Sequence, residues 1–491
     1  MKENPTKNVE QISKDLIPVT TKMKNTGAVG FFNVWIGIGI IIATFAIGGE
    51  AALYCNLQQI IFAAVVGTML LGILFIFTGD IGVEHGVSFP TYVNATLGHK
   101  GTMIPNALRT IYGPIWFGIQ SYFGATAINQ ILNVFFGFDN WVICFVLFVI
   151  VQVINTACGF KAMEKFANIA APSIILIGIF IAFRLVAMAN ANGIQIWSTV
   201  YSGDGPTLTA GSLTAFMYVT ILNMNYWADN ACEVETWSRY AKTTKGEKNL
   251  FKRNKCAIPG YVIALPLASG FMVVLGALST FVTGNYNPIE AINAVTNSPI
   301  VLTILLVMIV FAQWSTNVTA NLMPSGLCLN ALTRGKIPYW VGIVICGILG
   351  MVIRPWILVD HIGVFLTITG ALWSTMYGMT IADFLLLRKR KLNVPELYKK
   401  SGGQFEYFHG FNPAGMISFA FGLVFCVIFP DYAFIAGVIA SMILYYILAK
   451  FWVFKKYPQA DYEDTGDTYR GVSVGRDWDY DEETATVVSS Q

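Results

Sequence analysis

The sequence predicts an all-α polytopic membrane protein with about twelve transmembrane helices. Of its 491 residues, 55% are hydrophobic and 12% are charged, whereas a soluble globular protein usually carries about twice that charged fraction. Apolar runs of about 20 residues recur along the chain, which is the length that a helix needs to cross roughly 30 Å of hydrocarbon. These runs are continuous rather than alternating, unlike those of a strand-built barrel. The composition therefore excludes a soluble enzyme.

Twelve apolar runs are candidate spans, and the segments that flank them are polar. Residues 1–28 contain five lysines and lack the apolar core of a signal peptide, so we expect a cytoplasmic N-terminal tail. Residues 457–491 are polar and acidic, so we expect a disordered cytoplasmic tail. The transmembrane domain between them covers residues 29–456. Its spans lie near 29–53, 58–79, 103–135, 141–159, 166–189, 210–232, 257–283, 298–327, 337–353, 360–387, 413–429 and 431–454.

The distribution of basic residues predicts the orientation. With the N-terminus in the cytoplasm, 28 of the 31 Lys and Arg residues fall in inner segments. The exceptions are Arg109, inside the third span, and Arg184 and Arg354, near outer ends. The positive-inside rule therefore predicts a multi-pass protein of the cell membrane with both termini in the cytoplasm. Topology accounts for the basic loops, so nucleic acid is not an expected partner.

The eighth span contains the polar stretch FAQWSTNVTANLM, residues 311–323. At about 100° per residue, Ala312, Ser315, Thr316 and Thr319 share one arc of the helix, while Asn317 and Asn321 lie nearly opposite. Hydroxyls and freed carbonyls suit a hard cation, and carboxamides suit a neutral ligand that donates and accepts hydrogen bonds. The alternative is that these side chains only hold membrane helices together.

Spans 1, 3 and 6 also carry polar or flexible positions. Trp116 and Gln120 share a face of span 3, where they could stack on a flat ring and bond its edge, or simply pack. Gly37 and Gly39 allow span 1 to unwind, and three asparagines interrupt span 6. Interrupted helices at corresponding positions of two halves indicate a transporter site.

Ionisable groups inside the spans bear on the coupling ion. Asp229, in span 6, is the best candidate, while Glu50, Asp80 and Asp383 lie near span ends and the four histidines lie in or near loops. A proton-driven transporter usually carries carboxylates or histidines inside its spans. The scarcity of such groups favours a metal cation as the coupling ion. Asp229 leaves coupling to a proton as the alternative, although a carboxylate at a helix end is its more ordinary role. The eight scattered cysteines form no CxxC pair or Cys/His cluster, so we expect no other cofactor and no disulfide framework.

Three segments carry a resemblance to a known family. They are GVSFPTYVNATLGHKGTMIPNALRTIYGPIWFGIQSYFGATA, AQWSTNVTANLMPSG and IADFLLLRKRKLNVPELY. With them the chain, from about residue 29 to 456, resembles the nucleobase–cation symporter-1 family of cytosine/purine, uracil, allantoin and hydantoin permeases. It is most similar to the bacterial sodium–hydantoin symporter of that family. The resemblance implies a leucine-transporter-like fold: two inverted five-helix repeats with broken spans 1 and 6, followed by two C-terminal helices. It also implies alternating access around a site near the bilayer midplane.

The resemblance assigns roles to individual positions. Trp116 and Trp227 match the stacking tryptophans, and Gln120 and Asn321 match the hydrogen-bonding residues of the substrate site. The sodium site resembles five positions, the carbonyls of Gly37, Ile40 and Ala312 and the hydroxyls of Ser315 and Thr316.

The chain departs from the family pattern at three positions. Two bear on substrate specificity, and one lies at the inner end of span 6. Ile41 stands where the hydantoin symporter has a glutamine, and Tyr226 replaces its glycine before the span 6 tryptophan. Many relatives also carry an aspartate near Thr236, which EVETWSRYAK lacks. The substrate site thus loses one hydrogen-bonding group and gains a bulky phenol, so hydantoin specificity does not carry over.

The predicted function is secondary active import of a small planar amide-containing heterocycle by sodium symport. A nucleobase, allantoin or a hydantoin would fit between Trp116 and Trp227. The alternative is an amino-acid or amine symporter of the same fold, in which backbone amides near Gly37 and Gly39 bind a ligand carboxylate. No catalytic constellation indicates a membrane-embedded enzyme, and no repeated pore-lining motif indicates a channel.

Overall fold

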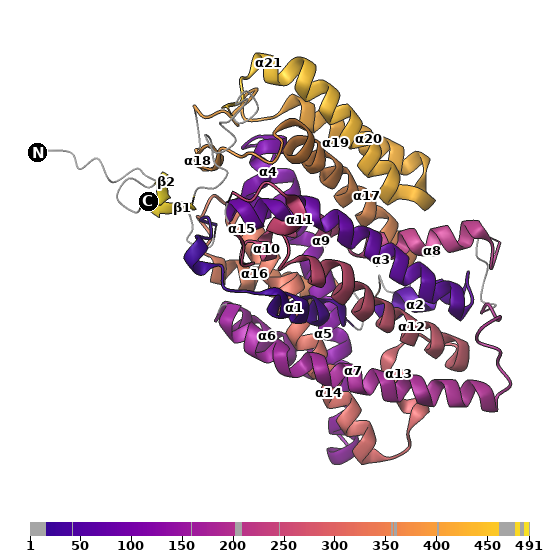
Figure 1. Ribbon diagram of the computed structural model, residues 1–491. Coiled ribbons are helices and arrows are strands. Elements are labelled where there is room, and N and C mark those ends of the chain that lie inside the picture. The colour runs from indigo at the N-terminus through magenta and orange to yellow at the C-terminus, as the bar shows by residue number, and fades with distance from the viewer. Residues whose placement is uncertain are drawn as a thin grey trace, which may run out of the picture.

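Helices occupy all twelve predicted spans (Figure 1). The computed structural model describes residues 16–490 apart from 42, 159, 202–208, 245, 355–356, 358–360, 400–401, 461–476 and 482–485, and of residues 160–174 and 489–490 it describes only the backbone. The main helices are α1 (Ala28–Gly39), α2 (Thr44–Ala52), α3 (Leu57–Asp80), α5 (Met103–Phe136), α6 (Trp141–Ala157), α7 (Phe160–Ala191), α8 (Leu213–Tyr226), α9 (Ala228–Glu233), α12 (Leu265–Thr283), α14 (Pro299–Asn317), α15 (Met323–Leu332), α16 (Tyr339–Val352), α17 (Ile362–Thr380), α19 (Pro413–Ile428) and α20 (Ala433–Leu448).

Wide π-helical turns extend or join several of these helices. A π-turn is rare and frequently lies at a functional site. The turn η5 (Val318–Leu322) joins α14 to α15, so residues 299–332 form one continuous helix of 34 residues. The other turns are η3 (Ile81–His85), η4 (Gly260–Ala264), η7 (Ile381–Leu387) and η9 (Ala449–Val453), the last of which leads into α21 (Phe454–Lys456).

Short elements that sequence analysis does not predict fill the loops. They are the helices α4 (Phe89–Leu97), α10 (Glu235–Ser238), α11 (Leu250–Arg253), α13 (Pro288–Val295) and α18 (Val394–Leu397), the 3-10 turns η2 (Thr21–Met23) and η8 (Pro430–Tyr432), and the strands β1 (Asp477–Asp481) and β2 (Thr486–Ser490).

The two strands pair antiparallel within a tail for which sequence analysis predicts disorder. Trp478 and Val487 are both buried. The Thr21 N–H donates to the Asp477 carboxylate at 2.8 Å, so the first and last described parts of the chain lie on the same side of the molecule, as an even number of spans requires. Residues 1–15 of the predicted N-terminal tail lie outside the described residues.

Five helical stretches of the described chain are long and apolar enough to cross a membrane, and α1 with α2 make a sixth if that bent pair is one span. The five are 57–85, 260–283, 299–332, 362–387 and 430–456. Other predicted spans correspond to shorter apolar helices such as α6, α16 and α19, or to more polar ones such as α5. On α6 and α19, Leu147 is 59% exposed and Val427 is 80% exposed. Such bare apolar faces indicate contact with lipid, so the chain is a membrane protein whose membrane-embedded part is helical.

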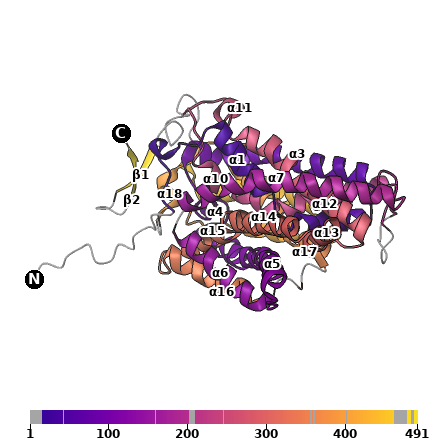
Figure 2. The ribbon, with the colours of Figure 1, turned by 90° about the horizontal axis from the view of Figure 1, so that it is seen from below.

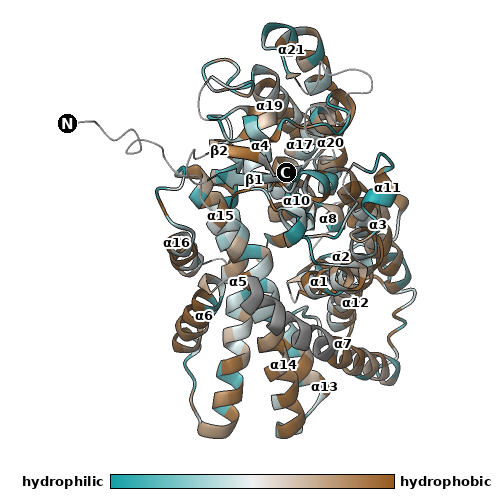
Figure 3. Ribbon diagram, turned by 60° about the vertical axis from the view of Figure 1, so that its left-hand side comes forward, coloured by the Kyte–Doolittle hydropathy of each residue, from teal (hydrophilic) through white to brown (hydrophobic). Residues whose placement is uncertain are grey.

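The helices form two groups that meet along the middle of the molecule. In the first, α5 packs against α6, α14, α15 and α16. In the second, α3 packs against α8, α9 and α12, and α17 packs against α8, α9 and α20. Figure 3 shows α5, α6 and α16 apart from α3, α8 and α12, and Figure 2 shows α5, α6 and α16 apart from α3 and α12 from below. The helix α7 contacts both α12 and α14 and so bridges the two groups.

Glycines allow α2 and α12 to cross at backbone contact. A Cβ on Gly276 would lie 2.6 Å from the Phe45 Cα and would overlap the Phe45 carbonyl oxygen, and a Cβ on Gly48 would lie 2.6 Å from the Ala277 nitrogen. Neither neighbour can move without shifting a helix. This crossing fixes the second half of the broken first span against α12.

We predict that Gly276→Ala destabilises the protein by about 1–3 kcal/mol, the usual cost of overpacking a well-packed interior. Thermal unfolding of the purified protein in detergent would measure the loss. The matched control is Gly270→Ala on the same helix, where the new methyl would meet its nearest neighbour, Val65 Cγ2, at an ordinary 3.4 Å. Equal melting temperatures for the two variants would contradict the backbone contact.

Candidate functional site

The first predicted span breaks at the middle of the molecule. The helix α1 ends at Gly39, the chain turns by 59°, and α2 begins at Thr44. The Ile40 N–H still donates to the Ile36 carbonyl at 3.0 Å, after which the helical pattern stops. Gly39 lies against α12, where a Cβ would come within 2.7 Å of the Ala268 Cβ. Because a broken helix leaves carbonyls without helical partners, this segment can offer oxygen ligands, as the sequence predicts for Gly37 and Ile40.

The ion-side residues of the eighth span lie together on α14. The Thr316 hydroxyl oxygen lies 2.9 Å from the Ala312 carbonyl oxygen, and the Ser315 hydroxyl oxygen lies 3.2 Å from it. All three residues are buried. Since α1 packs against α14, the two halves of the predicted oxygen set lie on neighbouring elements.

Aromatic side chains from three helices meet in the interior of the protein. The Tyr226 ring contacts the Trp116 indole with a centroid distance of 5.2 Å and the Trp227 indole with one of 4.9 Å, both edge-to-face. Phe365 of α17 also contacts Trp116, at 5.4 Å. The Trp227 indole N–H donates to the Ser269 hydroxyl of α12 at 2.9 Å. The structure therefore brings both predicted tryptophans and Tyr226 into one buried cluster.

The predicted carboxamides have different surroundings. Asn317 faces α5 and α6, where its amide nitrogen lies 2.9 Å from the Phe117 carbonyl oxygen, 3.0 Å from the Ser121 hydroxyl and 2.9 Å from the Gln152 side-chain oxygen. The Asn321 amide donates to the Asn317 side-chain oxygen at 2.9 Å. Sequence analysis puts both asparagines on one face, with a solute or neighbouring helices as alternative partners, and Asn317 takes the second role, as a hub between helices that holds Asn321 in place.

Gln120 links the two predicted faces. Its side-chain oxygen accepts a hydrogen bond from the Thr316 hydroxyl at 3.2 Å, and the residue is 1% exposed. A predicted substrate residue thus touches a predicted ion ligand. Ile41, the departure at the span 1 break, is also buried and adds no hydrogen-bonding side chain there.

Sequence reasoning does not identify a buried ionic cluster next to this site. The Arg109 guanidinium of α5 lies 3.3 Å from the Asp229 carboxylate and 2.7 Å from the Glu233 carboxylate, both on α9. It also donates to the Ala320 carbonyl of η5 at 2.7 Å. The expectation that carboxylates inside the spans are scarce therefore overlooks Glu233, which directly follows the predicted end of span 6. The sequence signal is the position of Arg109 in the middle of an apolar span, where a charge needs a partner.

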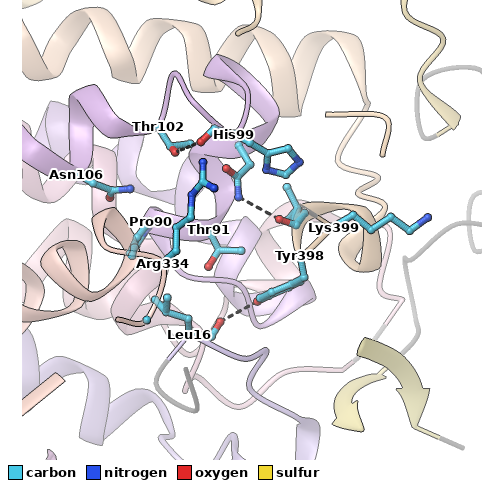
Figure 4. Close-up of a pocket in the computed structure, with 13 residues that line it drawn as sticks. Leu16, Pro90, Thr91, His99, Thr102, Asn106, Arg334, Tyr398 and Lys399 are labelled. Carbon is cyan, nitrogen blue, oxygen red and sulfur yellow. Dashed lines mark hydrogen bonds between the residues drawn. The ribbon is translucent and has the colours of Figure 1, made fainter. Parts of the chain in front are cut away.

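A cavity lies away from the predicted site residues. It has a volume of about 140 Å³ and lies between α4, the loop after α15 and α18. Figure 4 shows Arg334, His99 and Thr102 on one side and Tyr398 with Leu16 on the other. Burial lowers the pKa of His99 from its usual value. None of the residues predicted to bind substrate or sodium lines this cavity.

We predict that Asn317→Leu costs about 1–3 kcal/mol of stability, because it leaves buried polar partners on α5 and α6 without their donor. Thermal unfolding of purified protein would measure the loss. The matched control is Thr303→Val on the same helix, which removes an exposed hydroxyl bonded only to the Pro299 carbonyl. An Asn317 variant as stable as this control would contradict the role of Asn317 as a hub.

Comparisons with known proteins agree on one family. Residues 18–453 match the family of permeases for cytosine/purines, uracil, thiamine and allantoin. The chain is 25% identical over 444 residues to the hydantoin permease of Microbacterium maritypicum, covering 90% of this chain and 89% of that one. It is 24% identical over 479 residues to the allantoin permease of Bacillus subtilis, covering 92% and 95%.

The fold also matches a solved structure. It is the structure of Mhp1, a nucleobase–cation–symport-1 family transporter, in a closed conformation with bromovinylhydantoin bound. The TM-score is 0.84 at 22% sequence identity, and the match covers 94% of this chain and 99% of that one. The two proteins therefore share a fold.

Proposed function

Because the chain belongs to the family of permeases for cytosine/purines, uracil, thiamine and allantoin, we propose that it imports a small planar amide-containing heterocycle together with sodium. The protein is a membrane transporter and not an enzyme. The substrate class follows its relatives, which are hydantoin and allantoin permeases. The proposed topology is twelve spans over residues 29–456, as two inverted five-helix repeats and two C-terminal helices, with residues 1–28 and 457–491 in the cytoplasm.

The buried cluster of Trp116, Tyr226 and Trp227 carries the proposal. Indoles offer flat apolar faces on which an aromatic or amide ring stacks. Gln120 and Asn321 provide amides that both donate and accept hydrogen bonds, which matches the alternating N–H and C=O groups along the edge of a nucleobase, a hydantoin or allantoin. An amino acid would instead need a site for a carboxylate and an ammonium group, and a planar ring fits the paired indoles better.

Sodium is proposed to bind between the span 1 break and α14. Its ligands are the carbonyls of Gly37, Ile40 and Ala312 and the hydroxyls of Ser315 and Thr316, all of them hard oxygen donors of the type that such cations prefer.

The bond from Thr316 to Gln120 suggests how ion and solute are coupled. The single hydroxyl proton of Thr316 has two acceptors within reach, the Ala312 carbonyl and the Gln120 side-chain oxygen. A cation held by the Ala312 carbonyl repels that proton and directs it to Gln120. The Gln120 side-chain oxygen then accepts this hydrogen bond, and the Gln120 N–H groups are available to the solute. Each ligand raises the affinity of the other equally, since binding coupling is reciprocal.

We predict that Trp116→Ala weakens heterocycle binding about 5- to 150-fold, because base–aromatic stacking contributes about 1–3 kcal/mol. Intrinsic tryptophan fluorescence of the purified protein would be titrated with uracil, allantoin and a 5-substituted hydantoin, with leucine as a competitor. Trp116→Phe should retain part of the affinity. The matched control is Trp314→Ala, an indole of α14 that instead contacts Phe148 and Asn155.

Two results of this titration contradict the proposal. If Trp116→Ala binds the ring as tightly as the wild-type protein, the stacking role is wrong. If leucine alone binds to the wild-type protein, the amino-acid alternative replaces the heterocycle.

We predict that Thr316→Ala removes most of the dependence of substrate affinity on sodium, which is about 5- to 150-fold for a coupling free energy of 1–3 kcal/mol. Titrations with sodium and with choline as the replacement cation would measure it. Thr316→Ser, which keeps the hydroxyl, should restore the dependence. The matched control is Thr319→Ala, because that hydroxyl bonds the Ser315 and Thr316 carbonyls one turn further on. Unchanged sodium dependence in Thr316→Ala would reject the ion assignment while leaving the ring site intact.

A further inference from the structure

One guanidinium serves two carboxylates inside the helix bundle. The Arg109 side chain is fully buried, and those of Asp229 and Glu233 are 5% and 1% exposed. Among the described groups around them, the titratable neighbours are phenols, thiols and one further carboxyl group, so Arg109 provides the positive charge of the cluster. These neighbours are Tyr112 on α5, Tyr226 on α8, Cys232 on α9, Glu235 on α10, Cys328 on α15 and Cys346 on α16.

Charge balance requires a proton in this cluster. A buried charge without a partner costs several kcal/mol, and two carboxyl groups that share one site do not both ionise. One guanidinium balances one carboxylate, so the second carboxyl group of this pair is neutral while the cluster is closed, and the same rule makes the buried Glu235, whose oxygens accept no hydrogen bond from the described residues, neutral as well. The Asp229 carboxylate accepts two further bonds, at 2.8 and 2.7 Å, from the backbone and side chain of Asn230, which stabilise its charged form. The proton therefore resides mainly on Glu233, although it belongs to the pair.

The cluster also joins the two helix groups. Arg109 belongs to α5 and bonds the Ala320 carbonyl of η5, both in the first group. Asp229 and Glu233 belong to α9, which packs against α3, α8 and α17 of the second group. Along α5 the cluster lies seven residues before Trp116, and along span 6 Asp229 follows Trp227 by two residues. It therefore lies next to the aromatic cluster, on the side of the basic loops.

We propose that Arg109, Asp229 and Glu233 form a proton-binding latch that keeps the transporter closed toward the basic-loop side. This inference rests on the proposed transport function. When the latch opens, water reaches Asp229 and Glu233, and at neutral pH the pair loses its proton. The pair thus holds one more proton in the closed state than in the open state. By linkage, raising the pH favours opening, and the ratio of open to closed protein changes by up to tenfold per pH unit.

A distance measurement across the two groups tests the latch. Spin labels would be placed at Lys252→Cys on α11, which packs against α3, and at Lys336→Cys between α15 and α16, since both side chains are exposed. The background carries Cys158→Ser and Cys256→Ser, because the other six cysteines are buried. Pulsed electron resonance of the protein in nanodiscs from pH 5.5 to 8.5 gives the fraction with the longer distance.

Three variants separate the latch from a general effect of pH. Glu233→Gln keeps the shape of the side chain but replaces the carboxyl group with an amide that does not titrate. The fraction of open protein in this variant should therefore be nearly independent of pH. Asp229→Asn should behave in the same way, and it keeps the test available if Glu233→Gln does not fold. The matched control is Glu235→Gln, two residues further on, because Glu235 makes no ion pair with Arg109. This variant should follow the wild-type pH profile.

The outcomes of this experiment decide whether the cluster acts as a proton-binding latch. A pH-dependent wild type, pH-independent Glu233→Gln and Asp229→Asn variants and a wild-type-like control support the latch. A wild-type distance that ignores pH, a Glu233→Gln profile equal to the wild type, or a control that also loses its pH dependence overturns it. Fluorescence titration of the same samples with heterocycles tests the proposed function separately, because the distance profile needs no ligand.

Discussion

Every polar group that the helices bury must find its partner inside the protein, because hydrocarbon offers none. This constraint accounts for the arrangement around α14. Asn317 holds α5 and α6 through three oxygen atoms, and it fixes Asn321 at the same time. Trp227 is anchored separately, by its bond to Ser269 of α12. The two predicted tryptophans therefore belong to different helix groups, each with its own polar anchor. A ring held between the two tryptophans would lose contacts whenever the two helix groups separate.

The same constraint distinguishes the ion pairs of three buried arginines, Arg253, Arg388 and Arg109. Arg253 pairs with Asp80 and Glu84 at the end of α3, and Arg388 pairs with Asp383 of η7, whose carboxylate also accepts bonds from Tyr92 and Tyr445. In both clusters the paired charges lie either at the end of one helix or on the segment that packs against that end. Arg109 instead pairs with carboxylates on the other side of the boundary between the helix groups. A change in the relative position of the groups would thus leave the first two clusters intact and break the third.

The sequence predicts positions along helices better than it predicts partners between them. The helices at the twelve predicted positions and the break after Gly39 follow from apolar runs and glycines, which are local signals. The helical arc of Ala312, Ser315 and Thr316 is also local, and the structure keeps these residues together. The sequence leaves two roles open for Asn317, and the structure shows the one between helices; the helical angle cannot decide this, because it says nothing about Gln152, which lies 165 residues away. Glu233 was overlooked because it lies at the predicted end of its span, and only the fold brings it to Arg109. Trp227 is a prediction of the family resemblance alone, because no periodicity singles it out.

The residues that depart from the hydantoin symporter lie where the ring is proposed to bind. Tyr226 contacts both indoles, so a flat ring can enter between them only if the phenol turns aside. This rotation lowers the affinity of every ligand. It lowers the affinity of a bulky ligand most, because the displaced phenol and the ligand then compete for space. Ile41 removes a hydrogen-bonding side chain at the span 1 break without creating an unsatisfied group. A ligand edge that faces Ile41 therefore gains no side-chain hydrogen bond there. The ion side of α14 has no such departure, so selection among heterocycles is proposed to depend on Tyr226 and Ile41, separately from the sodium ligands.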